Sequence, residues 1–236
     1  MNNIFLAAAT RSGSTHIKNC FVLLGWRAAT THICLDEHFN EEHMVDAKIA
    51  TALFPMGGFV FQQHTRAIGR NVEILREYGV KPVVTYRNVL DSLVSLKDST
   101  GKDPRKGYTF LPLHLPDWDQ MSEDDKLWWL AYNMIPWWYS FYVSWRQANI
   151  DKLFIRYDEF YDNQTAGLAQ ILEFTGNPIP EDGKLDLVSL HKGGKFNVGI
   201  SGRGWDLTPG IIDLAYSQAK AWGPWREEIE CNLLAH

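Results

Sequence analysis

A short polar loop near the amino end carries residue types that bind anions. The stretch TRSGSTH lies between an apolar run and a segment with helical spacing. Arg11 supplies a fixed charge with forked donors, and Gly13 permits a tight turn. Ser12, Ser14 and Thr15 add hydroxyl donors. The start of a helix contributes backbone N–H groups and a favourable dipole, so the loop indicates a cradle for phosphate or sulfate.

A second arginine ends a β-branched segment. In YRNVLDSLVSL, Arg87 closes an expected strand over residues 81–87, and Ser95 lies eight residues later. A helix over residues 89–97 places Asp91 and Ser95 one turn apart on one face. Arg87 and Ser95 can then hold one phosphate from two sides. Two anion sites at strand ends of one parallel sheet favour a nucleotide with two separate anionic groups.

Each motif also has an ordinary structural interpretation. The first loop is a common strand–turn–helix connection if Ser14 only caps the helix. Arg87 and Ser95 are then a surface arginine and a helical serine. The first loop has one glycine and no lysine, so it is not a Walker A motif, GxxxxGK[ST]. This disfavours a kinase that uses ATP and magnesium, which stays an alternative together with a non-catalytic nucleotide-binding protein.

Strand-like and helix-like segments alternate along the chain and must position these motifs. The alternation predicts a three-layer α/β fold, with a mainly parallel central sheet and helices on both faces, in a single domain over residues 1–236. Residues 98–120 are expected to form a long surface loop. The expected strands cover residues 3–9, 59–62, 81–87 and 153–157, and the expected helices residues 14–24, 68–78, 89–97, 124–148, 165–175 and, last, 211–222.

The composition limits the class of protein. The chain has 236 residues, of which 45% are hydrophobic, so it can bury a full core. A net charge of −5 argues against a non-specific nucleic-acid binder. The sequence has no clear apolar stripe for an interface, so it does not predict the oligomeric state. Three dispersed cysteines, Cys20, Cys34 and Cys231, imply no disulfide framework. The amino end carries no signal peptide, so a cytoplasmic protein is expected.

Residues 127–145 form an uncharged run of 19 residues rich in aromatic side chains. Asn133, Pro136 and several hydroxyl groups within it suit a bilayer poorly, so we expect a buried helix and no membrane span. Most of its tryptophans are expected in the core. The stretch THICLDEHFNEEH is rich in histidine and acidic residues but matches neither HExxH nor a CxxC site, so no metal site is expected there.

The pair TRSGSTH and YRNVLDSLVS resembles the cytosolic-type sulfotransferases, which use 3′-phosphoadenosine 5′-phosphosulfate (PAPS). FVFQQHTRA resembles the family's strand ending in Lys-Thr-His, and LFIRYDEFYDN its segment near the adenine. PWWYSFYVSW resembles the aromatic helix just before that segment. The resemblance implies a P-loop-NTPase-like sulfotransferase fold. It also implies sulfate transfer from PAPS to a hydroxyl or amine of a small-molecule or glycan acceptor, with release of 3′,5′-bisphosphoadenosine (PAP) and no metal requirement.

The resemblance also implies roles for individual residues. His64 takes the place of the catalytic base, and Arg11 would stabilise the leaving phosphate as the second catalytic group. The first loop would hold the 5′-phosphosulfate, and Arg87 and Ser95 the 3′-phosphate. The donor-binding residues expected in this way are Arg11, Ser12, Gly13, Ser14, Thr15, Arg87, Ser95, Tyr157, Arg203 and Gly204.

Several positions depart from the family pattern. Arg11 and Gln62 stand where the family has lysines, and His16 stands where a tryptophan usually stacks on the adenine. The family's carboxyl-terminal Arg-Lys-Gly element is not matched cleanly by KFNVGISGRGWDLTP. Arg203 is favoured over Lys195 for the 3′-phosphate, because its flanking glycines let the backbone approach a ligand.

Overall fold

The computed structural model describes residues 1–30, 43–102, 118–180, 185 and 201–235. Its centre is a five-stranded sheet in which every neighbouring pair of strands is parallel, in the order β2-β3-β1-β4-β5. This confirms the predicted α/β class. The strands are β1 (Ile4–Ala8), β2 (Arg27–Ala29), β3 (Phe59–Gln63), β4 (Pro82–Tyr86) and β5 (Leu153–Arg156).

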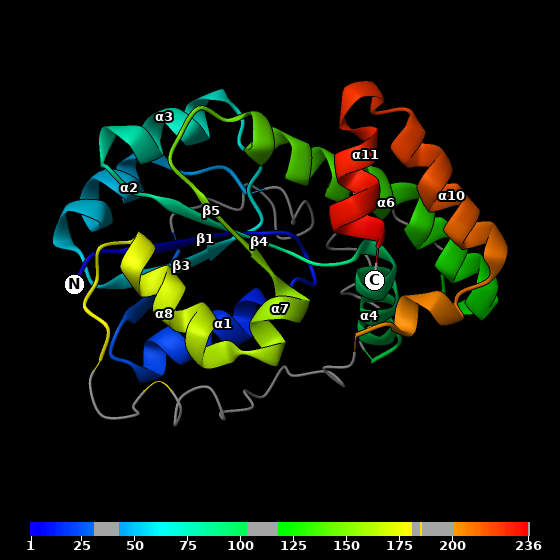
Figure 1. Ribbon diagram of the computed structural model, residues 1–236, viewed down its shortest axis with the longest axis horizontal. Helices are drawn as coiled ribbons and strands as arrows, with labels where there is room; N and C mark the ends of the chain where they lie inside the picture. Colours follow the sequence, from blue (N-terminus) through cyan, green and yellow to red (C-terminus); the bar gives the residue numbers. More distant parts are fainter. Residues whose placement is uncertain (31–42, 103–117, 181–184, 186–200, 236) are drawn as a thin grey trace.

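Helices cover both faces of this sheet (Figure 1). Alternate residues of β1 point to opposite faces: Ile4 and Leu6 belong to one buried cluster, whereas Phe5 and Ala7 belong to the other. The first cluster also contains residues of α1 (Ser14–Leu23) and α8 (Gln164–Phe174). The second is completed mainly by α3 (Gly69–Glu77), α4 (Val89–Lys102), α6 (Glu123–Gln147) and α10 (Pro209–Lys220), with Ala50 of α2 (Ala47–Leu53).

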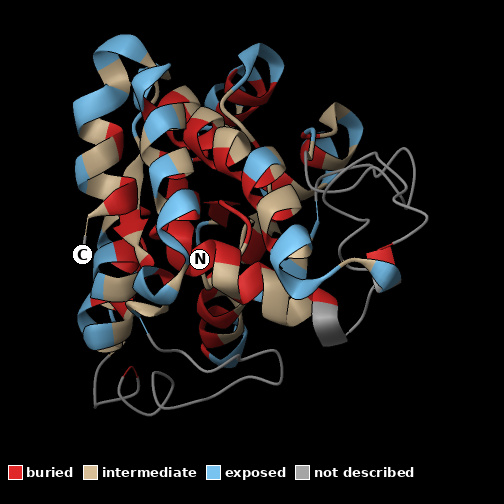
Figure 2. Ribbon diagram, turned by 90° about the vertical axis from the view of Figure 1, so that its right-hand side faces the viewer, coloured by how far each residue is buried: buried red, intermediate tan, exposed pale blue. Residues whose placement is uncertain are grey.

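The inner strands of the sheet are buried, the edge strands β2 and β5 are less so, and the helices turn exposed residues outward (Figure 2). All five residues of β1 and all five of β4 are buried. A parallel sheet covered on both faces has such continuous apolar strands, because neither face meets water. The central strands therefore form a rigid base for the loops that leave them.

The aromatic run between residues 127 and 145 lies in α6, as predicted. Ser122 caps the helix by accepting a hydrogen bond from the backbone N–H of Asp125. Trp138, Tyr139 and Trp145 are almost fully buried against the sheet and its neighbouring helices. Within the described ranges, no helix has both the length and the apolar character needed to cross a membrane.

The structure differs from the predicted elements in several places. α4 continues to Lys102, so the first five residues of the expected loop over 98–120 are helical; residues 103–117 lie outside the described part. Tyr157 begins α7 (Tyr157–Asp162) and does not end a strand. β2 and α2 were not predicted, because they are short and lack a clear period. After α10 (Pro209–Lys220), α11 (Arg226–Ile229) follows, so α10 is not the last helix.

Short helical turns complete the described chain. They are η1 (Phe54–Met56), η2 (Trp118–Gln120), η3 (Arg203–Asp206), η4 (Gly223–Trp225) and the π-helical η5 (Glu230–Leu234).

Candidate active site

The expected site residues gather at the carboxyl edge of the sheet. β1 lies between β3 and β4, and β5 follows β4. Because all the strands are parallel, the segments after them leave the sheet at the same edge. The loop with Arg11, the end of β3 with His64, and the start of α4 with Arg87 are therefore neighbours in space. Open parallel sheets bind ligands at this edge.

The backbone of the first loop takes an unusual path. Arg11 has φ 66° and Gly13 has φ 71°, and Arg11 is the one non-glycine residue with positive φ in the described chain. A Cβ at Gly13 would lie 2.0 Å from Cε2 of Tyr157, so glycine is required for space as well as for conformation. An arginine in the left-handed region costs about 1–2 kcal/mol. Such strain is concentrated at ligand sites, which makes this loop the leading candidate.

The hydroxyl side chains of the loop divide into two groups. Ser12 is fully buried and shares a 2.9 Å hydrogen bond with Oγ1 of Thr85, so its hydroxyl secures the loop to β4. Ser14 and Thr15 both accept hydrogen bonds from Nε2 of Gln62, at 2.9 and 3.1 Å. No side chain of the described residues caps the start of α1. The helix start thus combines two hydroxyls and an amide at the place expected to hold an anion.

Arg11 reaches across the site to α4. Its Nε and Nη2 donate to Oγ of Ser95 at 3.2 and 3.0 Å, and its Nη1 lies 3.5 Å from Oγ of Ser99. The sequence assigned Arg11 and Ser95 to different phosphates, whereas the structure joins them directly. The two candidate anion sites are therefore adjacent, and Arg11 connects the first loop to one face of α4.

His64 follows β3 and faces the end of β1. Its Nδ1 lies 2.9 Å from the carbonyl oxygen of Ala8. A carbonyl can only accept, so Nδ1 carries the proton and the lone pair of the neutral imidazole is on Nε2. Because Ala8 is the last residue before the first loop's turn, the imidazole stands beside the anion cradle. This placement suits a group that takes a proton from a hydroxyl.

Arg87 is buried among two carboxylates and an aromatic ring. Its guanidinium lies 3.6 Å from Asp91, 3.7 Å from Asp158 and 4.8 Å from the centre of the Tyr157 ring. Burial raises the pKa of Tyr157, and the positive charge of Arg87 opposes that rise. Tyr157 therefore stays neutral and packs between Gly13 and Arg87.

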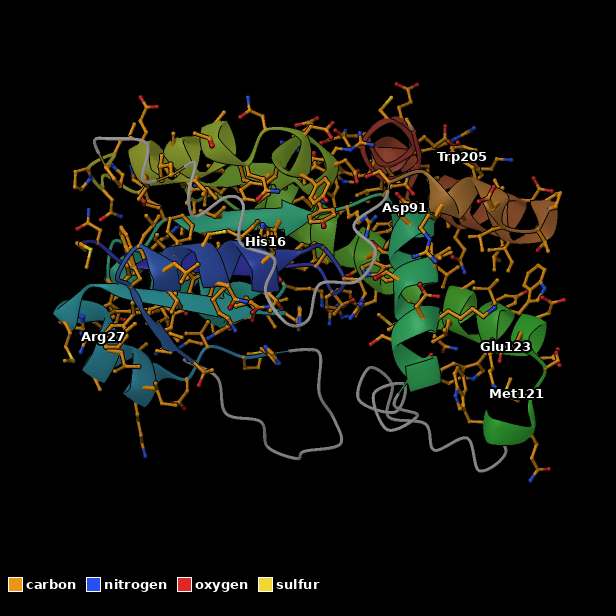
Figure 3. All side chains as sticks on the ribbon, turned by 90° about the horizontal axis from the view of Figure 1, so that it is seen from below. His16, Arg27, Asp91, Met121, Glu123 and Trp205 are labelled. Carbon is orange, nitrogen blue, oxygen red and sulfur yellow. The ribbon has the colours of Figure 1, made fainter. Side chains whose placement is uncertain are left out.

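The segment with Arg203 and Gly204 packs on the first turn of α4. The backbone N–H groups of Gly202 and Gly204 donate to the two oxygens of Asp91, at 2.9 and 2.7 Å. A Cβ at Gly204 would lie 2.4 Å from Cβ of Leu90. Asp91 lies at the end of α4 that faces this segment and its neighbour Trp205 (Figure 3). Arg203 is thus near the site, whereas Lys195 lies outside the described residues.

Arg203 itself turns toward α4. Its Nη2 donates to Oδ2 of Asp98 at 2.8 Å. Asp98 follows Ser95 by one turn, so Arg203 and Arg11 contact the same helix from two directions.

His16 is the departure with the clearest structural consequence. It is 8% exposed, its Nε2 lies 2.7 Å from Oε1 of Gln164, and its ring meets Phe160 edge-on. The imidazole therefore joins α1 to the helices after β5. His16 is thus an interior packing residue.

Several residues of the site were not identified as such from the sequence. Gln62 appeared only as a departure, yet it holds the hydroxyls of Ser14 and Thr15. Asp158 accepts from Ser201 and lies beside Arg87. Trp138 of α6 donates to the carbonyl and hydroxyl oxygens of Thr10. These contacts join segments far apart in the sequence, and no local pattern indicates them.

The histidine-rich stretch falls largely outside the described part, in which only His43 of its histidines appears. Among the described residues, no group of three potential ligands could hold a metal ion.

Solved structures with a similar architecture include two sulfotransferases and a retinol dehydratase. Mouse sulfotransferase SULT7A1 complexed with PAP has a TM-score of 0.66 and 14% identity, over 99% of this chain and 89% of that one. Retinol dehydratase in complex with androsterone and the inactive cofactor PAP has a TM-score of 0.63 and 15% identity, over 93% and 80%. A sulfotransferase from Alicyclobacillus acidocaldarius has a TM-score of 0.51 and 12% identity, over 100% and 97%.

No protein-family model and no curated protein matches the sequence itself. The likeness of structure, however, extends over nearly the whole chain. The chain therefore has the fold of the PAPS-dependent sulfotransferases.

Proposed function

We propose that this protein is a sulfotransferase that moves the sulfuryl group of PAPS to a hydroxyl or amine. The acceptor in this proposal is a small molecule or a glycan in the cytoplasm, and PAP is released. The scheme needs no metal ion and no nucleic-acid partner. The fold likeness supports the class of protein, and the residues of the site support the reaction.

The observation that carries the proposal is the meeting of His64 with the first loop. Nδ1 of His64 is 2.9 Å from the carbonyl oxygen of Ala8, which ends the strand before the loop. In this proposal, the base for an acceptor hydroxyl would lie beside the cradle for the anion. Group transfer requires this pairing, because the acceptor must lose a proton where charge leaves the donor.

The residues present fit a donor with two anionic groups. The 5′-phosphosulfate would lie at the start of α1, on Arg11, Gly13, Ser14 and Thr15, because this helix start has no side-chain cap among the described residues. Gln62 would add an amide donor in place of the family's lysine. The cradle is preorganised, since Gly13 is fixed by the ring of Tyr157.

The 3′-phosphate would lie where Arg87, Ser95 and the segment with Arg203 converge. The guanidinium of Arg87 lies 3.6 Å from Asp91 and 3.7 Å from Asp158, next to the start of α4. Ser95 already receives two donors of Arg11, so its hydroxyl faces the same region. Gly204 lets the backbone approach α4 closely at this point.

PAPS, when bound, would supply the sulfuryl group that is transferred. His64 would accept the acceptor's proton on Nε2, because Nδ1 is held as a donor to Ala8. Arg11 would stabilise negative charge on the leaving phosphate. A guanidinium does not give up its proton, so this contribution is electrostatic.

A thermal-shift titration with PAP, and in parallel with magnesium and ATP, tests the donor site. We expect PAP to stabilise the protein without metal, since a ligand at 100 times its dissociation constant adds about 2.7 kcal/mol. Ser95→Ala and Arg87→Ala are expected to lose this stabilisation. Arg70→Ala is the control, because Arg70 is exposed and pairs with Glu73 on α3.

Removal of Arg87 takes a cation away from Asp91 and Asp158, of which Asp158 keeps its pairing with Arg156, and it lowers stability by itself. Ser95→Ala is therefore the decisive variant. Stabilisation by magnesium and ATP with no response to PAP would overturn the proposal in favour of a kinase. A positive PAP response justifies a screen of hydroxyl and amine acceptors with labelled PAPS.

A further inference from the structure

A second histidine lies against the proposed base. The rings of His43 and His64 have centroids 5.4 Å apart with an interplanar angle of 40°. His43 comes from the segment before α2, whereas His64 follows β3. The two residues therefore meet although they belong to different segments of the chain.

The two residues are joined by a reciprocal pair of hydrogen bonds. The backbone N–H of His43 donates to the carbonyl oxygen of His64 at 2.8 Å. In return, the backbone N–H of His64 donates to Nδ1 of the His43 ring at 3.0 Å. The side chain of His43 therefore takes part in fixing the backbone that carries the base.

Neighbouring residues secure His43 in this position. Its carbonyl oxygen accepts from the hydroxyl of Thr65. The fully buried Asn71 contacts Thr65 and accepts the backbone N–H of Val45 through its Oδ1 at 2.9 Å. The segment of residues 43–45 is thus attached to the end of β3 at several points, and the imidazole of His43 has a defined place.

These contacts give the two imidazoles opposite tautomers. Nδ1 of His43 accepts a hydrogen bond, so its neutral ring carries the proton on Nε2. Nδ1 of His64 donates to Ala8, so its lone pair is on Nε2. The two neutral rings therefore carry their protons on different nitrogens.

We propose that His43 is a positioning residue: by holding the backbone of His64 it keeps Nδ1 of the His64 ring against the carbonyl oxygen of Ala8, and so keeps the lone pair of that ring on Nε2. This inference rests on the proposed function for its meaning in catalysis.

Nitrogen-15 NMR of the full chain, labelled at histidine, tests the inference without any acceptor. Long-range proton–nitrogen spectra distinguish protonated from unprotonated ring nitrogens. We expect the Nδ1–H form for His64 and the Nε2–H form for His43 in the wild type. In His43→Leu, the Nδ1 signal of His64 is expected to shift toward the tautomer mixture of free histidine.

His43→Asn is the matched variant, because its Oδ1 can accept the backbone N–H of His64 in place of Nδ1. It is expected to keep the wild-type signals of His64 and also serves if His43→Leu fails to fold. Unchanged His64 signals in His43→Leu, or a shift in His43→Asn as large as in His43→Leu, would overturn the positioning role. So would an Nε2–H form of His64 in the wild type.

PAP binding is measured on the same samples. If the wild type does not bind PAP, this counts against the proposed function. The tautomer result then decides the role of His43 by itself. Normal PAP binding by His43→Leu together with altered His64 signals would place the effect of His43 at the base and not at the donor site.

Discussion

At the scale of single residues, a substitution of His64 distinguishes donor binding from catalysis. It contacts Ala8 through Nδ1, and no phosphate-binding role is assigned to it. We expect His64→Ala to bind PAP as the wild type does and to lose at least about 10²-fold in turnover, because general-base assistance is removed. Turnover is measured as PAP released from PAPS with any acceptor that the wild type uses. Near-normal turnover would remove His64 from the mechanism.

Arg11 combines a functional side chain with an unfavourable backbone conformation, φ 66°. Glycine adopts this region freely, whereas alanine does not. We expect Arg11→Gly to be more stable than Arg11→Ala by about 1 kcal/mol in urea unfolding, while both lose affinity for PAP. The same pair of substitutions at Lys18, inside α1, should show the reverse order of stability. If the Gly and Ala variants had the same order of stability at both positions, this would contradict backbone strain at Arg11.

At the scale of elements, the turn into α1 depends on the space that Tyr157 leaves at Gly13. Gly13 and Gly79 both have positive φ, at 71° and 61°, but of the two only Gly13 has a neighbour that an added Cβ would meet, at 2.0 Å. We expect Gly79→Ala to cost about 1 kcal/mol for the backbone alone. Gly13→Ala should cost about 1–3 kcal/mol more, because the Tyr157 ring must move.

Urea unfolding of the two variants measures this difference, and PAP titration measures its effect on the site. PAP affinity should fall in Gly13→Ala and stay unchanged in Gly79→Ala. A Gly13→Ala variant that binds PAP normally would show that the turn does not form the cradle.

At the scale of the whole molecule, a buried thiol and several buried tyrosine hydroxyls make the stability of the fold sensitive to high pH. Burial raises the pKa of Cys20 to about 11 and raises the pKa values of Tyr86, Tyr139, Tyr142 and Tyr157 above the ordinary tyrosine value. The folded state then keeps protons that the unfolded chain releases. Stability is complete below pH 9.0, the ordinary pKa of the thiol, and falls as the pH rises through the raised values.

The free energy of unfolding, measured in urea between pH 8 and pH 11, should therefore decrease steadily above about pH 9. The Cys20 thiol alone contributes on the order of 2–3 kcal/mol to this loss. Cys20→Ala should show a smaller loss over the same range. A flat profile in the wild type would contradict the burial of these groups.

Local patterns in the sequence determined the elements and the candidate residues. Alternating strands and helices indicated a parallel sheet, since period and length depend only on neighbouring residues. The four predicted strands and the helices α1, α3, α6, α8 and α10 were close to their observed bounds. TRSGSTH and YRNVLDSLVS marked the two ends of the site because turns, caps and charged groups are encoded locally.

Tertiary structure alone decided which residues meet. The order β3-β1-β4 places His64, Arg11 and Arg87 at one edge, and this order is set by pairing between distant segments. The contacts of Arg11 with Ser95, of Asp91 with Gly204, and of His43 with His64 each connect different elements. A sequence pattern predicts the helix or strand to which a residue belongs, but it does not predict the residue's partner in another element. The contact between His43 and His64 is therefore known only from the folded chain.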